Sequence, residues 1–188
     1  MNSTTQLRVW DPLIRVFHWT LVVAVLTAYF TEGDQLDLHV AAGYTVLGLI
    51  AFRLIWGFAG TRHARFVDFV FAPRVVWTYL KDLPKGTAAR FIGHNPAGGA
   101  MIVALLLSLT VTTFSGVAFY GADRWLGPLA GIMQNTDDFW IDVLKETHEI
   151  AANFTILLAA VHVCGVAFES WLHQENLIVA MVNGRKRA

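Results

Sequence analysis

An apolar stretch near the C-terminus, residues 147–172, constrains the fold of this chain more than any other feature. It reads THEIAANFTILLAAVHVCGVAFESWL, and an apolar run of this length is typical of a helix that crosses a lipid bilayer. The stretch nevertheless contains His148 and His162. Ionisable residues inside a membrane helix usually have a functional role. The sequence therefore predicts a transmembrane helix that carries a functional site.

The composition of the whole chain also indicates a membrane protein. Of its 188 residues, 55% are hydrophobic and only 15% are charged, whereas soluble domains carry about 25% charged residues. The formal net charge is zero, so electrostatics give no reason to expect nucleic acid as a partner. Cys164 is the single cysteine, which excludes an internal disulfide and a Cys-x-x-Cys-His haem attachment site.

The apolar segments predict an all-α fold, an antiparallel bundle of four transmembrane helices in one domain over residues 1–188. The expected spans are residues 13–31, 38–59, 97–120 and 147–172, and no cleavable signal peptide is expected. A basic connector, residues 60–96, joins the second and third spans. Within it, residues 73–83 have an apolar side, which predicts an extra amphipathic helix lying in the cytoplasmic membrane interface. A short helix is expected within residues 137–146, in the loop before the fourth span.

Lysine and arginine are distributed unevenly between the predicted loops. If the N-terminus lies inside, twelve of the fourteen belong to inner segments, and only Arg124 and Lys145 lie outside. Inner loops of membrane proteins carry an excess of Lys and Arg. We therefore expect a multi-pass protein of the bacterial inner membrane with both termini in the cytoplasm.

The histidines fall at two depths in this topology. His148 and His162 are fourteen residues apart, which brings them within about 40° on one helical face and separates them by about 21 Å along the axis. Over that distance the two histidines cannot bind the same metal ion, but each can bind a separate metal centre. His18 lies toward the inner side of the first span, and His39 lies at the outer start of the second. We therefore expect His18 to pair with His162, and His39 with His148.

Two facing histidines are the ligand set of a b-type haem, whose iron takes an axial ligand on each side. The pairs therefore predict two non-covalent haem b groups, an inner and an outer one. A structural zinc site is a weaker interpretation because its ligands gather around one ion. Two alternatives stay open: hydrogen-bonded core histidines, and a non-redox bundle whose histidines bind metal or relay protons. A haem spectrum of the purified protein separates these alternatives from a cytochrome.

The other histidines are not expected to bind haem. His173 shares the face of His162 but is about 38 Å from the depth of His148, beyond a hydrocarbon core of about 30 Å, so it belongs in the head-group layer. His63 and His94 lie in the basic connector and are expected to be solvated.

Two arginines are candidate partners for the haem propionates, because a guanidinium pairs well with a carboxylate. Arg53 follows His39 by fourteen residues and so lies on the same helical face at the inner depth, and Arg15 precedes His18 by about one turn. The alternative for both is that they extend to the membrane surface from a helix end.

Several motifs resemble those of one family. They are VWDPLIRVFHW at residues 9–19, LHVAAGY at 38–44, RLIWGFAG at 53–60, GHNP at 93–96, ETHE at 146–149, and HQENL at 173–177 with the GRKR tail at 184–187. With these motifs the chain resembles the bacterial cytochrome b561 family, which includes the b-type cytochrome subunit of nickel–iron hydrogenases. The resemblance extends over nearly the whole chain, from Trp10 to Arg187.

The resemblance implies a four-helix membrane cytochrome with two b haems, ligated at His18, His39, His148 and His162. Such proteins pass electrons between the quinone pool and a partner redox protein. One branch is similar to a superoxide oxidase that reduces ubiquinone. An electron carrier is therefore the first interpretation and a superoxide:quinone oxidoreductase is the alternative. Superoxide-driven quinone reduction distinguishes the two.

Each membrane face would then need an exchange partner. The outer loop, residues 121–146, holds Trp125, Trp140 and an acidic pair at 137–138, which suits a basic periplasmic redox protein such as a c-type cytochrome. These tryptophans can equally be interfacial anchors. On the inner side, a quinone can approach beside the 73–83 helix, where Arg53 or His94 would orient its carbonyl.

Overall fold

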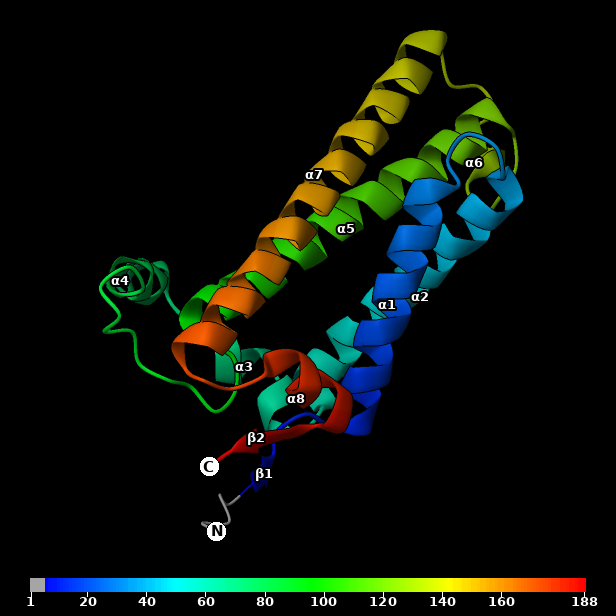
Figure 1. Ribbon diagram of the computed structural model, residues 1–188. Helices are drawn as coiled ribbons and strands as arrows, with labels where there is room; N and C mark the ends of the chain where they lie inside the picture. Colours follow the sequence, from blue (N-terminus) through cyan, green and yellow to red (C-terminus); the bar gives the residue numbers. More distant parts are fainter. Residues whose placement is uncertain (1–5) are drawn as a thin grey trace. The chain divides into compact units, whose positions relative to one another are not determined.

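The computed structural model describes residues 6–188 as a helical protein (Figure 1). Its four long helices are α1 (Pro12–Phe30), α2 (Leu36–Ala59), α5 (Pro96–Asp123) and α7 (Asp138–Leu172). Each is long and apolar enough to cross a membrane. The short elements are β1 (Gln6–Arg8), η1 (Arg62–Ala64), α3 (Phe66–Phe69), α4 (Pro73–Asp82), α6 (Ala130–Met133), α8 (Leu177–Asn183) and β2 (Arg185–Arg187). Four apolar helices confirm the prediction of a multi-pass helical membrane protein.

Local capping explains where several helices begin and end. Pro12 opens α1, and the backbone N–H of Ile14 donates to Asp11 Oδ1 over 3.0 Å. Asn95 caps α5 in the same way, because its Oδ1 accepts from Gly98 N at 2.7 Å. At the other end of the chain, α8 stops at Gly184, whose φ of 80° is the left-handed conformation that terminates helices.

Helix α7 begins at Asp138, so the expectation of a separate short helix in residues 137–146 is wrong. No Gly or Pro interrupts residues 138–147, and both residue types commonly end helices. Lys145 and Glu149 lie one turn apart across the expected boundary, with 3.8 Å between their charged atoms. The helix therefore continues from the loop into the predicted fourth span without a break.

The chain divides into two compact units, of which the first comprises residues 6–20, 52–104 and 159–188 of the described chain. Here β1 and β2 pair antiparallel, with Gln6 opposite Arg187, and so join the two ends of the described chain (Figure 1). The sequence carries no signal of this ribbon, because three-residue strands are too short to show a period of two. Val9, Trp10 and Ile14, which follow β1, are buried.

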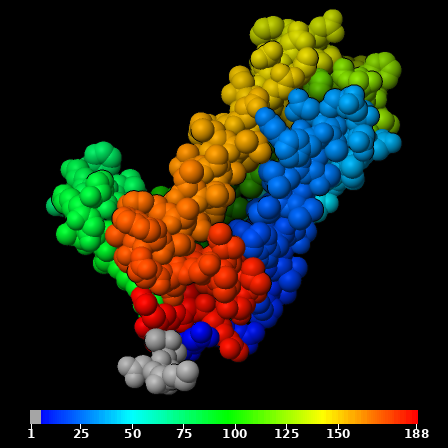
Figure 2. Space-filling model, viewed as in Figure 1, coloured from blue at the N-terminus to red at the C-terminus, as the bar shows by residue number. Residues whose placement is uncertain are grey.

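The predicted amphipathic segment forms helix α4, which Figure 2 shows as a projecting green lobe of the first unit. Its only buried residue is Tyr79, whose hydroxyl donates to Glu169 Oε1 over 2.7 Å. Trp77 and Leu80 are exposed, and the Lys81 ammonium lies 5.2 Å from the centre of the Trp77 ring. Helix α4 is thus held through Tyr79 while its apolar and basic side chains stay on the surface.

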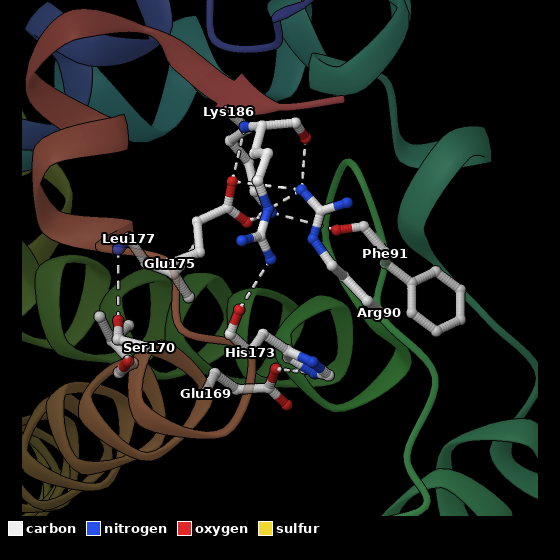
Figure 3. A network of polar contacts seen from close by, with 10 residues as sticks. Arg90, Phe91, Glu169, Ser170, His173, Glu175, Leu177 and Lys186 are labelled. Atoms are coloured by element: carbon white, nitrogen blue, oxygen red, sulfur yellow. Dashed lines mark hydrogen bonds and ion pairs between the residues drawn. The ribbon is translucent and has the colours of Figure 1, made fainter. Parts of the chain in front are cut away.

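A polar network holds the C-terminal tail in the first unit (Figure 3). Glu175 accepts hydrogen bonds from Arg90 Nη2 at 3.2 Å and from the backbone N–H of Arg187 at 2.7 Å. Lys186 is buried and donates to the carbonyl of Phe91 over 3.1 Å. Burial alone would raise the pKa of Glu175, but these hydrogen bonds and the nearby charges of Lys186 and Arg90 lower it below its usual value. Lys186 therefore ties the basic tail to the connector, while Arg185 and Arg187 remain exposed.

The second unit comprises residues 21–51 and 105–158. Its apolar core contains Ala24, Val46, Ile50 and Leu109. A chain of hydroxyl groups also joins α5 to α7: Ser108 Oγ lies 2.7 Å from Thr155 Oγ1, which in turn lies 3.3 Å from Thr112 Oγ1. Ser108 and Thr155 are both buried. Hydrogen bonds in such a low-dielectric setting are strong, so this chain fixes α5 against α7.

Candidate functional site

His39 from α2 and His148 from α7 lie close together in the second unit. Their ring centroids are 5.9 Å apart, and the ring planes are nearly perpendicular at 79°. Two metal–nitrogen bonds of about 2 Å, with about 1 Å from each nitrogen to its ring centre, would require about 6 Å between the centroids. The spacing therefore fits two imidazoles that ligate one metal ion from opposite sides.

Backbone carbonyls orient both rings of this pair. His39 Nδ1 lies 2.8 Å from the oxygen of Ala28, and His148 Nδ1 lies 2.8 Å from the oxygen of Thr112. A carbonyl only accepts hydrogen bonds, so each Nδ1 must carry the proton and donate it. Nε2 is then the unprotonated nitrogen on each neutral ring. This is the usual arrangement of metal-binding histidines, in which the second nitrogen fixes the tautomer.

A cavity of about 310 Å³ adjoins both rings. Its walls include the apolar side chains of Val25, Val46, Leu109 and Ile156, while Tyr44, Tyr120, Arg124 and Lys145 supply polar groups. Gly116 also lines it, and a Cβ there would lie 2.7 Å from His148 Cε1. A side chain at this position would displace the ring, so the glycine permits its approach. The volume and mostly apolar lining suit a cofactor with a few polar contacts.

His18 from α1 and His162 from α7 belong to the first unit. They are near enough for a charge on one ring to act on the other, and both are half-buried. The rings of His18 and Trp19 are perpendicular, with 5.1 Å between the centroids. His18 Nδ1 is buried and has no hydrogen-bond partner among residues 6–188. The structure thus brings this pair into the same region, but residues 6–188 provide neither ring with a backbone acceptor like those of His39 and His148.

Arg53 is buried within the protein, with only 4% of its surface exposed. Its guanidinium carbon lies 4.8 Å from the ring centre of Phe66 and 5.3 Å from that of Phe69. Its Nη1 has no hydrogen-bond partner within the described chain. Asp11 is the nearby acid, yet its Oδ2 accepts from Trp56 Nε1 at 3.2 Å and from Thr61 Oγ1 at 2.6 Å. A buried charge without a partner is costly, so a ligand carboxylate would fit beside Arg53.

Arg15 has a structural contact of its own. Its Nη1 donates to the carbonyl of Val182 in α8 over 2.6 Å, while its Nε is buried without a partner in residues 6–188. This hydrogen bond holds α1 to the C-terminal segment of the first unit. Only the remaining guanidinium donors are available for a carboxylate.

The expectation that His94 is solvated is wrong. Its ring centre lies 4.5 Å from that of Trp10 and 5.0 Å from that of Phe69, and its Nδ1 is buried. Burial, and then the positive charges of Arg53 and Lys186, lowers the pKa of His94 to about 3. The connector folds back over the start of α1, and no sequence periodicity could have revealed this.

The two remaining histidines are in local contacts. His63 is half-buried, and burial lowers its pKa. His173 follows α7 directly, and its Nε2 lies 3.2 Å from Glu169 Oε2. Within residues 6–188 no three His, Cys, Asp or Glu side chains converge as a tetrahedral metal site would require.

Comparisons with known proteins identify the family of the chain. The family described as prokaryotic cytochrome b561 matches residues 9–184. A protein of Azotobacter chroococcum mcd 1 is 26% identical over 98% of this chain and 90% of its own length. One of Rhodobacter capsulatus is 25% identical over 99% of this chain and 83% of its own length. Both are described as probable Ni/Fe-hydrogenase B-type cytochrome subunits. No solved structure matches the chain closely enough to be compared.

Proposed function

The chain belongs to the prokaryotic cytochrome b561 family, and from this membership we propose that it relays electrons across the bacterial inner membrane through two b haems. Haem b is the cofactor of a b-type cytochrome, and it supplies reversible one-electron chemistry when bound. The observation that carries the proposal is the His39–His148 pair, with 5.9 Å between ring centroids and both Nδ1 atoms tied to carbonyls.

Different residues would bind the two haems and influence their reduction potentials. His39 and His148 would be the axial ligands of the outer haem, and His18 and His162 those of the inner one. The carbonyls of Ala28 and Thr112 keep the outer rings in the tautomer that presents Nε2. Apolar walls exclude water and lower the local dielectric constant, which influences the reduction potential.

Arg53 and Arg15 would bind haem propionates. Arg53 is the stronger candidate, because it is buried and its Nη1 has no partner among the described residues. A guanidinium can donate two parallel hydrogen bonds to one carboxylate. Arg15 keeps its bond to Val182 and would contribute only through its other donors.

For topology, we propose an antiparallel bundle with both termini in the cytoplasm. The support is the uneven distribution of Lys and Arg, twelve in the proposed inner segments and two in the outer ones. Helix α4 would lie in the cytoplasmic interface, since it exposes Trp77 and Leu80 beside Lys81. Aromatic and basic side chains suit the head-group layer.

We further propose a quinone as the partner of the inner haem and a redox protein as the partner of the outer one. Relatives described as hydrogenase B-type subunits support a hydrogenase for the outer role, and a periplasmic c-type cytochrome is a second candidate. The segment from the end of α5 into the first turn of α7 exposes Trp125, Ile132, Phe139 and Trp140. Exposed aromatics beside acidic residues suit a weak docking surface.

One observation favours superoxide:quinone oxidoreductase activity as a second candidate. Arg124 and Lys145, the only cations of the proposed outer segments, both line the cavity beside His39 and His148. Their ion pairs with Asp123 and Glu149 reduce the net positive charge there. Superoxide-driven quinone reduction by the purified protein tests this candidate. A rate that equals the rate without protein would eliminate it.

The test of the main proposal is a haem count on purified variants. Replacing His39 or His148 by Ala should remove the outer haem and leave the inner one. Replacing His18 or His162 by Ala should remove the inner haem and leave the outer one. His63→Ala and His173→Ala serve as controls and should keep two haems per chain. The pairing is wrong if a His18→Ala/His162→Ala double variant still binds two haems by pyridine haemochrome.

A further inference from the structure

Two buried donors lie against the same aromatic ring in the unit that contains His18 and His162. The Phe69 ring centre is 5.3 Å from the guanidinium carbon of Arg53 and 5.0 Å from the centre of the His94 ring. Arg53 Nη1 and His94 Nδ1 are both buried, and neither has a hydrogen-bond partner within residues 6–188. Buried polar atoms are nearly always paired. Both atoms therefore need an acceptor, and their common neighbour Phe69 places them in the same region of the unit.

The acidic side chains of this unit that could serve as that acceptor have other partners. The carboxylate of Asp11 accepts from Ile14, Trp56 and Thr61. Glu169 accepts from the hydroxyl of Tyr79 and lies beside His173.

Glu175 is likewise engaged by Arg90 and by the backbone N–H of Arg187. The last two acids, Asp68 and Asp82, pair with Arg65 and Lys85. The acceptor for Arg53 and His94 is therefore best supplied by a ligand.

We infer that Arg53 and His94 form one carboxylate-binding site, walled by Phe66, Phe69 and Trp10. The guanidinium supplies the positive charge, and the imidazole supplies a second hydrogen bond. The carboxylate has two possible sources: a haem propionate, in which case the inference rests on the proposed function, or a separate anionic ligand.

The surroundings keep the two donors in complementary roles. Burial, together with the charges of Arg53 and Lys186, lowers the pKa of His94 to about 3, so its ring is neutral at physiological pH. A neutral imidazole donates one hydrogen bond without repelling the guanidinium. The Trp10 ring packs at a tilt of 44° against that of His94, with 4.5 Å between the centroids, and limits how far the His94 ring can turn.

The first arm of the test asks whether the carboxylate belongs to haem. Protein carrying haem labelled with ¹³C at its propionate carboxyls is compared by infrared difference spectroscopy and by redox titration. Arg53→Gln and His94→Gln should each shift the propionate bands and lower the midpoint potential of one haem, because a positive or polarising group is removed. The double variant should shift no further than the larger single shift, since both residues act on one group. Arg53→Lys keeps the charge and should retain much of the potential while the bands still shift.

Matched controls come from the same unit. Arg62→Gln and His63→Gln change an exposed arginine and the half-buried histidine next to it in η1. Both should leave the propionate bands and the potential unchanged.

The second arm uses acetate as the probe and thermal unfolding of the same purified proteins as the readout, with chloride at equal ionic strength as reference. If a separate ligand fills the site, acetate should raise Tm of the wild type but not of Arg53→Gln or His94→Gln. A propionate-band shift that requires both Arg53 and His94 supports the site and identifies haem as the source of the carboxylate. A rise of Tm with acetate that requires both residues supports the site and identifies a separate ligand. The inference is overturned if neither the infrared bands nor Tm depends on both residues. A protein without haem would refute the proposed function, while the acetate arm would still decide this site.

Discussion

Replacing Gly116 by Ala should weaken binding of the outer haem and lower its occupancy while leaving the inner haem unchanged. The added Cβ would lie 2.7 Å from His148 Cε1 and 2.8 Å from its Nδ1, whereas ordinary contacts are 3.4–4 Å. The ring must therefore retreat by about 0.7 Å. The backbone at residue 116 cannot move away easily, because it lies in the interior of helix α5 and is held by the hydrogen bonds of that helix.

That displacement is large compared with what the site tolerates. The bond between His148 Nδ1 and Thr112 O is 2.8 Å long, and a retreat of this size would stretch it to the limit of a hydrogen bond. Metal–ligand distances vary by only about 0.2 Å. Disturbing a group that orients a ligand typically lowers affinity about 10- to 100-fold, or about 1.4–2.8 kcal/mol.

The assay is a pyridine-haemochrome count on purified protein, combined with a redox titration that resolves the two haems. Gly48→Ala is the matched control, since a Cβ there meets nothing within 4 Å. It should keep both haems. The steric reasoning is refuted if Gly116→Ala retains two haems with unchanged potentials.

Three further predictions concern topology and pH. A reporter active only in the cytoplasm should work when fused after Lys85 and fail after Asn135; a signal from Asn135 would reverse the proposed orientation. The depressed pKa of His94 makes the folded state bind fewer protons than the unfolded state below pH 6.5, so stability should fall with decreasing pH by up to about 1.4 kcal/mol per unit. His94→Gln should flatten this slope in unfolding experiments between pH 4 and 7, and an unchanged slope would contradict the burial argument. Glu175→Gln should destabilise the protein at pH 7, and the difference should shrink as pH falls below 4.5; a constant difference would exclude the ion pairs as its cause.

Features that depend on local sequence could be predicted from the sequence alone. The length and apolarity of a segment decide whether it can cross a membrane, and the structure has four such helices. The constant rise and turn of a helix put His148 and His162 on one face at separate depths. Residue pattern therefore sufficed to nominate the histidine pairs, of which His39 and His148 lie with ring centroids 5.9 Å apart.

The tertiary structure alone decided how these side chains are held. The acceptors of His39 and His148 are backbone carbonyls of Ala28 and Thr112, which any residue type can provide, so no sequence signal marks them. The same holds for Gly116, whose role depends on the ring that approaches it.

Segments distant in sequence also determine burial. His94 was expected to be solvated. Arg53 was expected either to bind a propionate or to extend to the membrane surface. In the structure both side chains pack against Phe69. The tail pairs with β1 although neither strand has a readable pattern. Composition and periodicity report on neighbours along the chain, whereas hydrogen bonding and burial depend on contacts that form only when the chain folds.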